Sequence, residues 1–150
     1  MDEIVWAVNP RHDRLDSLAN YLSRFAYEYL SMAGIRFRLD FPLDLPTQPV
    51  TAEVRHNLFL AFKEALHNIV KHAAANEVRV ELKLAAAQLT LLVADDGRGF
   101  GQGTPAGRLA TGNGLANMQQ RLGEIGGRCE IHSEPEHGTT VTFIVPRTHD

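Results

Sequence analysis

The chain has 150 residues, and its 15 Lys and Arg against 18 Asp and Glu give a formal net charge of −3. This length suits one domain, and 44% hydrophobic residues are enough to build a core. A mildly acidic chain argues against nucleic acid as a partner, since nonspecific binders carry a basic face. No apolar run reaches the roughly 18 residues of a membrane span, so we expect no membrane contact. The single cysteine, Cys129, excludes an internal disulfide framework and favours a reducing, cytoplasmic location.

The first third of the chain predicts a helix and a strand after a short leading segment. We expect residues 1–12 to be the end of an upstream helix and a linker, since an apolar stretch there is closed by Pro10. Apolar residues recur three and four apart over 13–32, which predicts an amphipathic helix. Alternation over 35–41 predicts a half-buried strand, and three prolines within 42–49 predict an extended connector.

The rest of the chain predicts two helices and four strands, with each pair of strands joined by a short turn. These are a helix from Thr51 to about Ala74, strands over 77–84 and 89–93, a glycine-rich loop over 96–112, a helix over 113–125, and strands over 128–133 and 139–145. This order predicts an α/β two-layer sandwich, in which one mixed, mainly antiparallel sheet carries helices on one face. We expect the long helix to bury one apolar stripe, from Val54 to Ala73.

Four polar residues of the long helix share one face at helical spacing. They are Glu64, Asn68, Lys71 and His72. The carbonyl oxygen of Asn68 is a hard ligand that suits Mg²⁺, and Lys71 offers a point charge to a phosphate. Taken alone, such a face is more typical of a solvated helix surface with ordinary side-chain pairs than of a binding site.

A carboxylate and two glycines follow directly on a hydrophobic strand. Asp95 at the strand end is an acceptor held by a rigid element, and Gly97 and Gly99 would let a flat ligand approach the backbone. This pattern suits an exocyclic amine such as that of adenine. A tight Asp-Gly turn is the simpler explanation if no other part of the chain agrees.

Glycine is concentrated in one window, which holds seven of the 12 glycines. They are Gly97, Gly99, Gly101, Gly103, Gly107, Gly112 and Gly114. Gly112 and Gly114 stand at the start of a predicted helix, whose free N–H groups can bind an anion. Neither the P-loop pattern nor the dinucleotide Gly-x-Gly-x-x-Gly pattern is present. Thr139, which enters the last strand, has a hydroxyl that could bond toward Asp95, although threonine is common in strands.

In this order, the four motifs together resemble the GHKL ATP-binding domain, or Bergerat fold. Glu64 to His72 is similar to the N box, and Asp95-Asp96-Gly97-Arg98-Gly99-Phe100 to the G1 box. Gly112-Asn113-Gly114-Leu115 is similar to the G2 box, and Gly138-Thr139 to the closing Gly-Thr. The forms of the N box and G1 box are particularly similar to sensor histidine kinases whose response regulators are of the NarL type. The resemblance covers roughly residues 15–146 and assigns 13–150 to the ATP-binding domain.

The resemblance implies ATP and Mg²⁺ as cofactors and gives each site residue a role. Asp95 would accept the adenine amine with support from Thr139, and Gly97 and Gly99 would line the base. Asn68 would ligate Mg²⁺, with Lys71 and His72 near ribose or phosphate. Residues 101–112 would form a lid, with its hinge and the phosphate-binding helix start at Gly112, Gly114 and Leu115.

Glu64 has two possible catalytic roles by the same resemblance. In hydrolytic relatives this position holds the general base for water. In histidine kinases the nucleophile is a histidine on a separate domain, and the carboxylate would orient Mg²⁺ or assist proton transfer. We favour a catalytic role of the second kind over a purely structural one.

The implied partners are a helical hairpin that carries the phosphoacceptor histidine and dimerises, and a response regulator downstream. No such hairpin separates His12 from the ATP-binding motifs, so His12 is not expected to be the acceptor. The chain would then bind Mg·ATP without phosphorylating itself. Two alternatives stay open: a stand-alone GHKL kinase of the serine/threonine type that acts on an anti-sigma-factor antagonist, and a non-catalytic nucleotide-sensing module.

Overall fold

The structure is a computed structural model, which describes residues 14–42, 45, 49–73, 77–85, 87–96, 113–134 and 138–146. Its helices and strands follow the predicted order. They are α2 (Leu15–Ala33), β1 (Arg36–Asp40), α3 (Ala52–Asn68), the π-helix η2 (Ile69–Ala73), β2 (Glu77–Leu84), β3 (Gln88–Asp95), α5 (Asn113–Glu124), β4 (Arg128–Glu134) and β5 (Gly138–Pro146). The leading segment, the glycine window from Gly97 to Gly112 and the turn before Gly138 lie outside the described residues.

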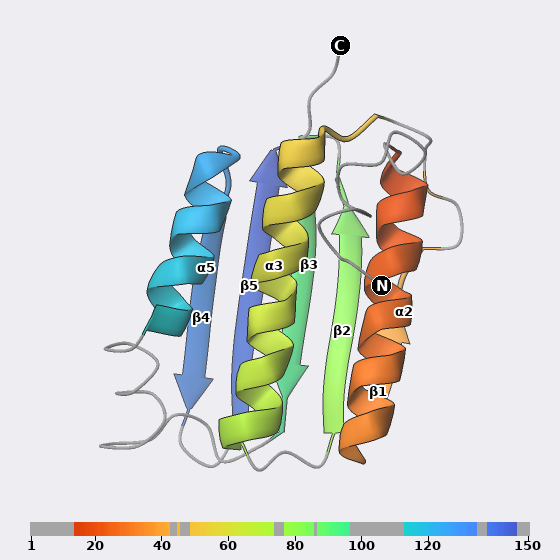
Figure 1. Ribbon diagram of the computed structural model, residues 1–150, viewed down its shortest axis with the longest axis vertical. Helices are drawn as coiled ribbons and strands as arrows, with labels where there is room; N and C mark the ends of the chain where they lie inside the picture. The colour runs from red at the N-terminus through yellow and green to blue at the C-terminus, as the bar shows by residue number, and fades with distance from the viewer. Residues whose placement is uncertain are drawn as a thin grey trace.

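The five strands form one mixed sheet in the order β1-β2-β3-β5-β4. The edge strand β1 runs parallel to β2, and every other pair is antiparallel. The α-helices of the described residues cover one face of this sheet, with α3 between α2 and α5 (Figure 1). The predicted two-layer sandwich with a mainly antiparallel sheet is therefore confirmed.

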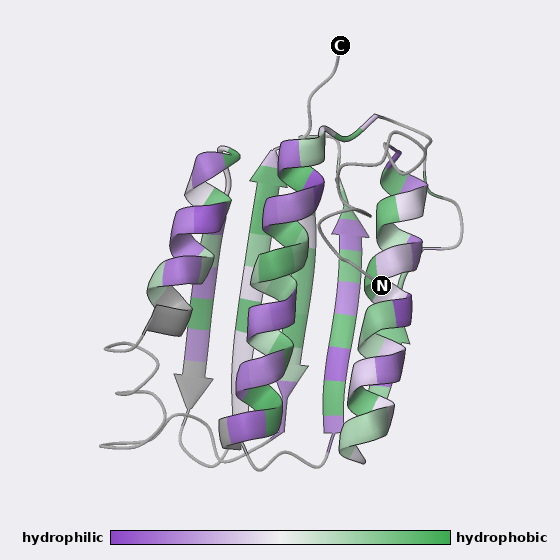
Figure 2. Cartoon of the chain, in the orientation of Figure 1, coloured by the Kyte–Doolittle hydropathy of each residue, from purple (hydrophilic) through white to green (hydrophobic). Residues whose placement is uncertain are grey.

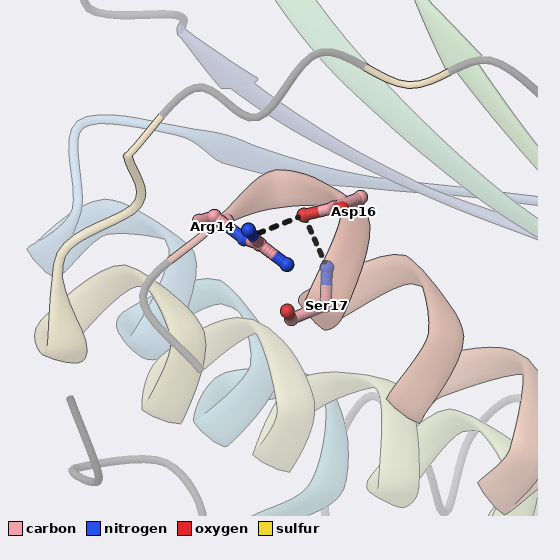
Figure 3. A network of polar contacts seen from close by, with 3 residues as sticks. All are labelled: Arg14, Asp16 and Ser17. Atoms are coloured by element: carbon pink, nitrogen blue, oxygen red, sulfur yellow. Dashed lines mark hydrogen bonds and ion pairs between the residues drawn. The ribbon is translucent and has the colours of Figure 1, made fainter. Parts of the chain in front are cut away.

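The start of α2 is fixed by a small polar network (Figure 3). The Asp16 carboxylate accepts a hydrogen bond from the Ser17 N–H at 2.9 Å and pairs with Arg14 Nε at 3.2 Å. A carboxylate in the first turn also stabilises the positive end of the helix. Arg14 forms a β-bridge with Pro49, so the entry to α2 lies against the chain that leads into α3.

The helix α3 is buried on more sides than the predicted single stripe. Leu58 and Phe62 are fully buried as expected, but so are Phe59 and Leu66, because α2 covers a second side of the helix. The rings of Phe25 and Phe59 meet edge to face with centroids 5.1 Å apart. Hydrophobic residues dominate the inner strands β3 and β5, whereas β2 alternates (Figure 2). The core therefore lies between the sheet and the inner faces of all three helices.

The prediction of one continuous α-helix to Ala74 is wrong beyond Asn68. Residues Ile69–Ala73 form a π-helix, which has a wider turn than the α-helix. A single π turn inside a helix is frequent at functional sites. The side chains after Asn68 therefore point in other directions than a continuous α-helix predicts.

Cys129 on β4 is expected to be unreactive in the folded chain. It is 8% exposed, and burial, with the neighbouring charge of Glu130, raises the pKa of its thiol from 9.0 to about 12. At pH 8 the folded chain then holds thiolate in only about one molecule in ten thousand. We expect Ellman's reagent to label one thiol per chain in guanidinium and almost none without it. The raised pKa should also lower the free energy of unfolding above about pH 9, because only the Cys129 thiol of the unfolded chain ionises there. Rapid labelling of the native chain would contradict the burial.

Candidate functional site

The predicted site residues gather at one end of the sheet. The carboxyl ends of α3 and β3 meet the amino ends of β5 and α5 there, at the lower end in Figure 1. This end therefore carries Asn68 from α3, Asp95 from β3 and Thr139 from β5. Residues far apart in sequence thus reach one region because adjacent strands and the helix above them end together.

Asp95 is the last residue of β3 and is only 7% exposed. Its neighbours in the sheet are Val78 on β2 and Thr139 on β5, so it lies between two strands. A carboxylate in such a place is costly to bury without donors. An acceptor held on two sides by strands is well suited to recognise a ligand donor in one fixed direction.

Thr139 and Gly138 complete this side of the site. Thr139 is 3% exposed and stands directly opposite Asp95 in the ladder. Gly138 precedes it with a φ of +93°, a conformation that other residues rarely adopt. A Cβ atom on Gly138 would lie 2.0 Å from the Asp95 carbonyl oxygen. The closing Gly-Thr pair is thus in direct backbone contact with Asp95.

Asn68 ends α3 at the point where the π-helix begins. Its side chain is 8% exposed, and its Nδ2 atom has no hydrogen-bond partner among the described residues. A buried amide without a partner costs about 1–3 kcal/mol, so it marks a group that a ligand or water would satisfy. Oxygen and nitrogen of an amide are interchangeable by rotation, so the same group can offer its carbonyl oxygen.

Glu64 lies one turn before Asn68 and lines a cleft between α3 and α5. The cleft has a volume of about 330 Å³. Its lining residues are Tyr29, Leu60, Ala61, Lys63, Glu64, His67, Asn117, Met118 and Arg121. Glu64 is half-buried, so part of it remains accessible to solvent at the cleft. This position fits a group that acts on a ligand entering from outside.

The remaining predicted residues are placed only in part. Lys71 is exposed in the π-helix, and His72 lies in the same segment. Gly114 and Leu115 belong to the first turn of α5, as predicted. Gly97, Gly99 and Gly112 lie outside the described residues. Because Lys71 and His72 lie in a π-helix, the α-helical spacing that predicted their shared face with Glu64 does not apply to them.

Several cleft residues were missed from the sequence. Asn117 and Arg121 are four residues apart on α5, a spacing that could have indicated a polar face turned toward α3. Arg121 Nη1 donates to Asn57 Oδ1 at 3.4 Å and so links the two helices. His67 is exposed, as expected of a surface histidine, but it also lines the cleft. The spacing on α5 indicates a polar face but not which helix that face meets, which is why this cleft was not predicted.

Neither a histidine-cysteine metal centre nor a membrane helix is found in the part of the chain that the structure describes. No group of three or more His, Cys, Asp or Glu side chains there could hold a metal ion. None of the described helices combines the length and the apolar character needed to cross a membrane.

A buried strand-end carboxylate, a hydroxyl on the next strand and an amide at the helix end form a polar cluster at one end of the α/β sandwich. Comparison with known proteins identifies the family to which this fold belongs. The profile of the histidine kinase-, DNA gyrase B- and HSP90-like ATPases matches residues 53–149. The chain belongs to this family of ATP-binding domains.

Its relatives are sensor histidine kinases. The sensor histidine kinase LiaS of Bacillus subtilis is 34% identical over 108 residues, which are 72% of this chain and 29% of LiaS. The oxygen sensor histidine kinase NreB of Staphylococcus carnosus is 31% identical over 149 residues, covering 95% of this chain and 40% of NreB. The chain therefore spans well under half the length of either relative.

A solved structure supports the same fold. The histidine kinase domain of a blue-light activated histidine kinase from Erythrobacter litoralis superposes with a TM-score of 0.74 at 23% identity. The match covers 96% of this chain and 68% of that chain. This match shows that the two chains share a fold.

Proposed function

We propose that the chain binds Mg·ATP and supplies the γ-phosphoryl group for phosphorylation of a histidine in two-component signalling. The observation that carries this proposal is Asp95, a buried acceptor at the end of β3 opposite Thr139, in a domain of this family. The reaction depends mainly on positioning and charge stabilisation, so few protein groups need to take part in bond making.

Each described site residue has a role in this proposal. Asp95 accepts the adenine amine and Thr139 supports it. Asn68 fits as an oxygen ligand for Mg²⁺, since rotation of its buried amide can place Oδ1 where Nδ2, which has no partner among the described residues, now lies, and Mg²⁺ takes few protein ligands. Mg²⁺, when bound, would neutralise charge on the phosphates. Glu64, which opens onto the cleft, assists transfer by orienting groups or by moving a proton.

The other residue roles that the resemblance implies belong to the same proposal. Gly97 and Gly99 line the base, and Gly112, Gly114 and Leu115 bind phosphate at the start of α5. Lys71 and His72 lie near ribose or phosphate. The exposed position of Lys71 suits a side chain that reaches a ligand from the rim.

We propose that this chain acts as one part of a longer signalling protein. Residues 1–12 would end a dimerisation helix, and 13–150 would be the catalytic domain. The partners would be the hairpin that carries the acceptor histidine and a response regulator of the NarL type. The location would be cytoplasmic, with no contact between this domain and nucleic acid or membrane.

Labelled ATP distinguishes histidine transfer from the other activities. We expect the chain, mixed with the helical hairpin of its own full-length protein, to place acid-labile label on the hairpin. Acid-stable label would indicate a serine/threonine-type kinase, and ATP binding without label would indicate a nucleotide sensor.

Glu64→Gln should slow the transfer and leave ADP affinity unchanged, because Glu64 acts on the reacting groups and not on the base. Glu53→Gln, an exposed position in the first turn of α3, is the matched control.

A further inference from the structure

At the end of the β2–β3 ladder, the side chain of Asp96 makes one of the two hydrogen bonds that join the strands. Val78 pairs with Asp95, so Glu77 and Asp96 face each other one step further along. The Asp96 N–H donates to the Glu77 carbonyl at 3.1 Å. The return bond runs from the Glu77 N–H to Asp96 Oδ1 at 2.8 Å. A side-chain carboxylate thus accepts the bond that a main-chain carbonyl accepts in a regular antiparallel pair.

Because the Asp96 side chain replaces a main-chain acceptor, β3 can end here without leaving a main-chain N–H of β2 unbonded. β3 ends at Asp95, and the chain is released from regular pairing at the next residue. The N–H of Glu77 is nevertheless satisfied, and its acceptor is charged, which makes the bond shorter and stronger than a neutral one. The peptide that joins Asp95 to Asp96 is therefore held firmly on the β2 side.

The β5 side confines the same peptide by close packing. A Cβ on Gly138 would lie 2.0 Å from the Asp95 carbonyl oxygen and 3.1 Å from the Asp96 Cα. The backbone of β5 therefore leaves no space for this peptide to move toward it. Two independent contacts, one on each side, set the direction in which the Asp95 side chain leaves the backbone.

We propose that Asp96 is a positioning residue for nucleotide selection, acting through its bond to the Glu77 N–H to hold Asp95 in line with the adenine amine. This inference rests on the proposed role of Asp95. It assigns to Asp96 no contact with the base, and its effect is confined to ligands that present a donor to Asp95.

Binding of ADP and IDP by the full chain tests this role. IDP carries a carbonyl where ADP carries the amine, so it offers Asp95 no donor at C6, and its only donor near that edge of the base is the N1–H. In Asp96→Ala we expect ADP affinity to fall about tenfold, the effect of one hydrogen bond to a charged group, while IDP affinity stays nearly constant. Asp96→Asn keeps an oxygen at the same place and should bind ADP within about threefold of wild type. Both constants are measured by calorimetry.

Hydrogen exchange and a control variant complete the test. The Glu77 amide should be protected in the wild type and in Asp96→Asn, and should exchange faster in Asp96→Ala. Glu130→Ala removes an equal charge from an exposed position on β4, where Glu130 pairs with Arg128, and should change neither affinity. An unprotected Glu77 amide in the wild type, or an unchanged ratio of ADP to IDP affinity in Asp96→Ala, would overturn the inference. A wild type that binds IDP as well as ADP would instead refute the role of Asp95 itself.

Discussion

Replacing Asp95 with asparagine is expected to weaken ADP binding by about a hundredfold. The side chain is 7% exposed at the end of β3, so its bond to the ligand forms away from bulk water. Asparagine has the same shape but is neutral, so even with its oxygen turned to the adenine amine the bond loses its charge, and an amide nitrogen replaces the second carboxylate oxygen in the buried site. Loss of a charge-assisted bond with a buried group left unsatisfied costs about 2.7 kcal/mol, which corresponds to the expected factor. The measurement is a calorimetric titration with ADP and Mg²⁺.

Asp40→Asn is the matched control for this substitution. Asp40 is also the last residue of a strand, β1, but it is exposed and lies on the edge of the sheet. We expect its variant to bind ADP like the wild type. Equal affinity in Asp95→Asn and the wild type, with both variants folded by circular dichroism, would show that Asp95 is not the adenine acceptor.

Gly138→Ala is expected to lower the free energy of unfolding by about 3 kcal/mol and to weaken ADP binding as well. Two costs add at this position. A residue with a Cβ at φ +93° is strained by about 1–2 kcal/mol, and the Cβ would collide with the Asp95 carbonyl oxygen at 2.0 Å. Relief of such an overlap moves the backbone and costs a further 1–3 kcal/mol or so. Because the atom that must move belongs to Asp95, stability and binding should fall together.

Gly126→Ala separates the two costs. Gly126 also has a positive φ, +77°, but the nearest atom to its Cβ would be Pro146 Cγ at 3.7 Å, an ordinary contact. We therefore expect a loss of only about 1 kcal/mol and no change in ADP binding. Unfolding in urea measures both variants. Equal losses at Gly126 and Gly138 would mean that the collision is relieved without cost.

Most of the fold could be predicted because its elements have strong periodic patterns. The helix predicted over 113–125 is observed as Asn113–Glu124, and the strand predicted over 77–84 is observed with those bounds. Alternating hydrophobic residues, and glycines at the ends of elements, indicate these bounds from the local sequence. The positions of Asp95 and Thr139 at adjoining strand ends followed from the same patterns, and the ladder pairs them directly.

The features that escaped prediction arise from contacts between distant elements. Burial of Arg55 and Asn57 on α3 cannot be deduced from local spacing, because it depends on the neighbouring segments that cover them. Arg55 donates to the Val50 carbonyl and Asn57 contacts Arg121 on α5. The π-helix after Asn68 is a second example, since a wider turn has no distinct residue preference. The face shared by Glu64 and Lys71 was predicted on α-helical geometry, which ends at this point.

The strand order has a consequence for how the site responds to partial unfolding. β1 and β4 are the sheet edges, while Asp95 and Thr139 belong to β3 and β5, each of which has a strand on both sides. Fraying at either edge leaves the β3–β5 ladder intact, so the acceptor should keep its geometry in partly open states of the domain. We therefore expect local fraying of the edge strands to leave nucleotide affinity unchanged. We expect affinity to be lost only when the pairing of β3 with β5 breaks.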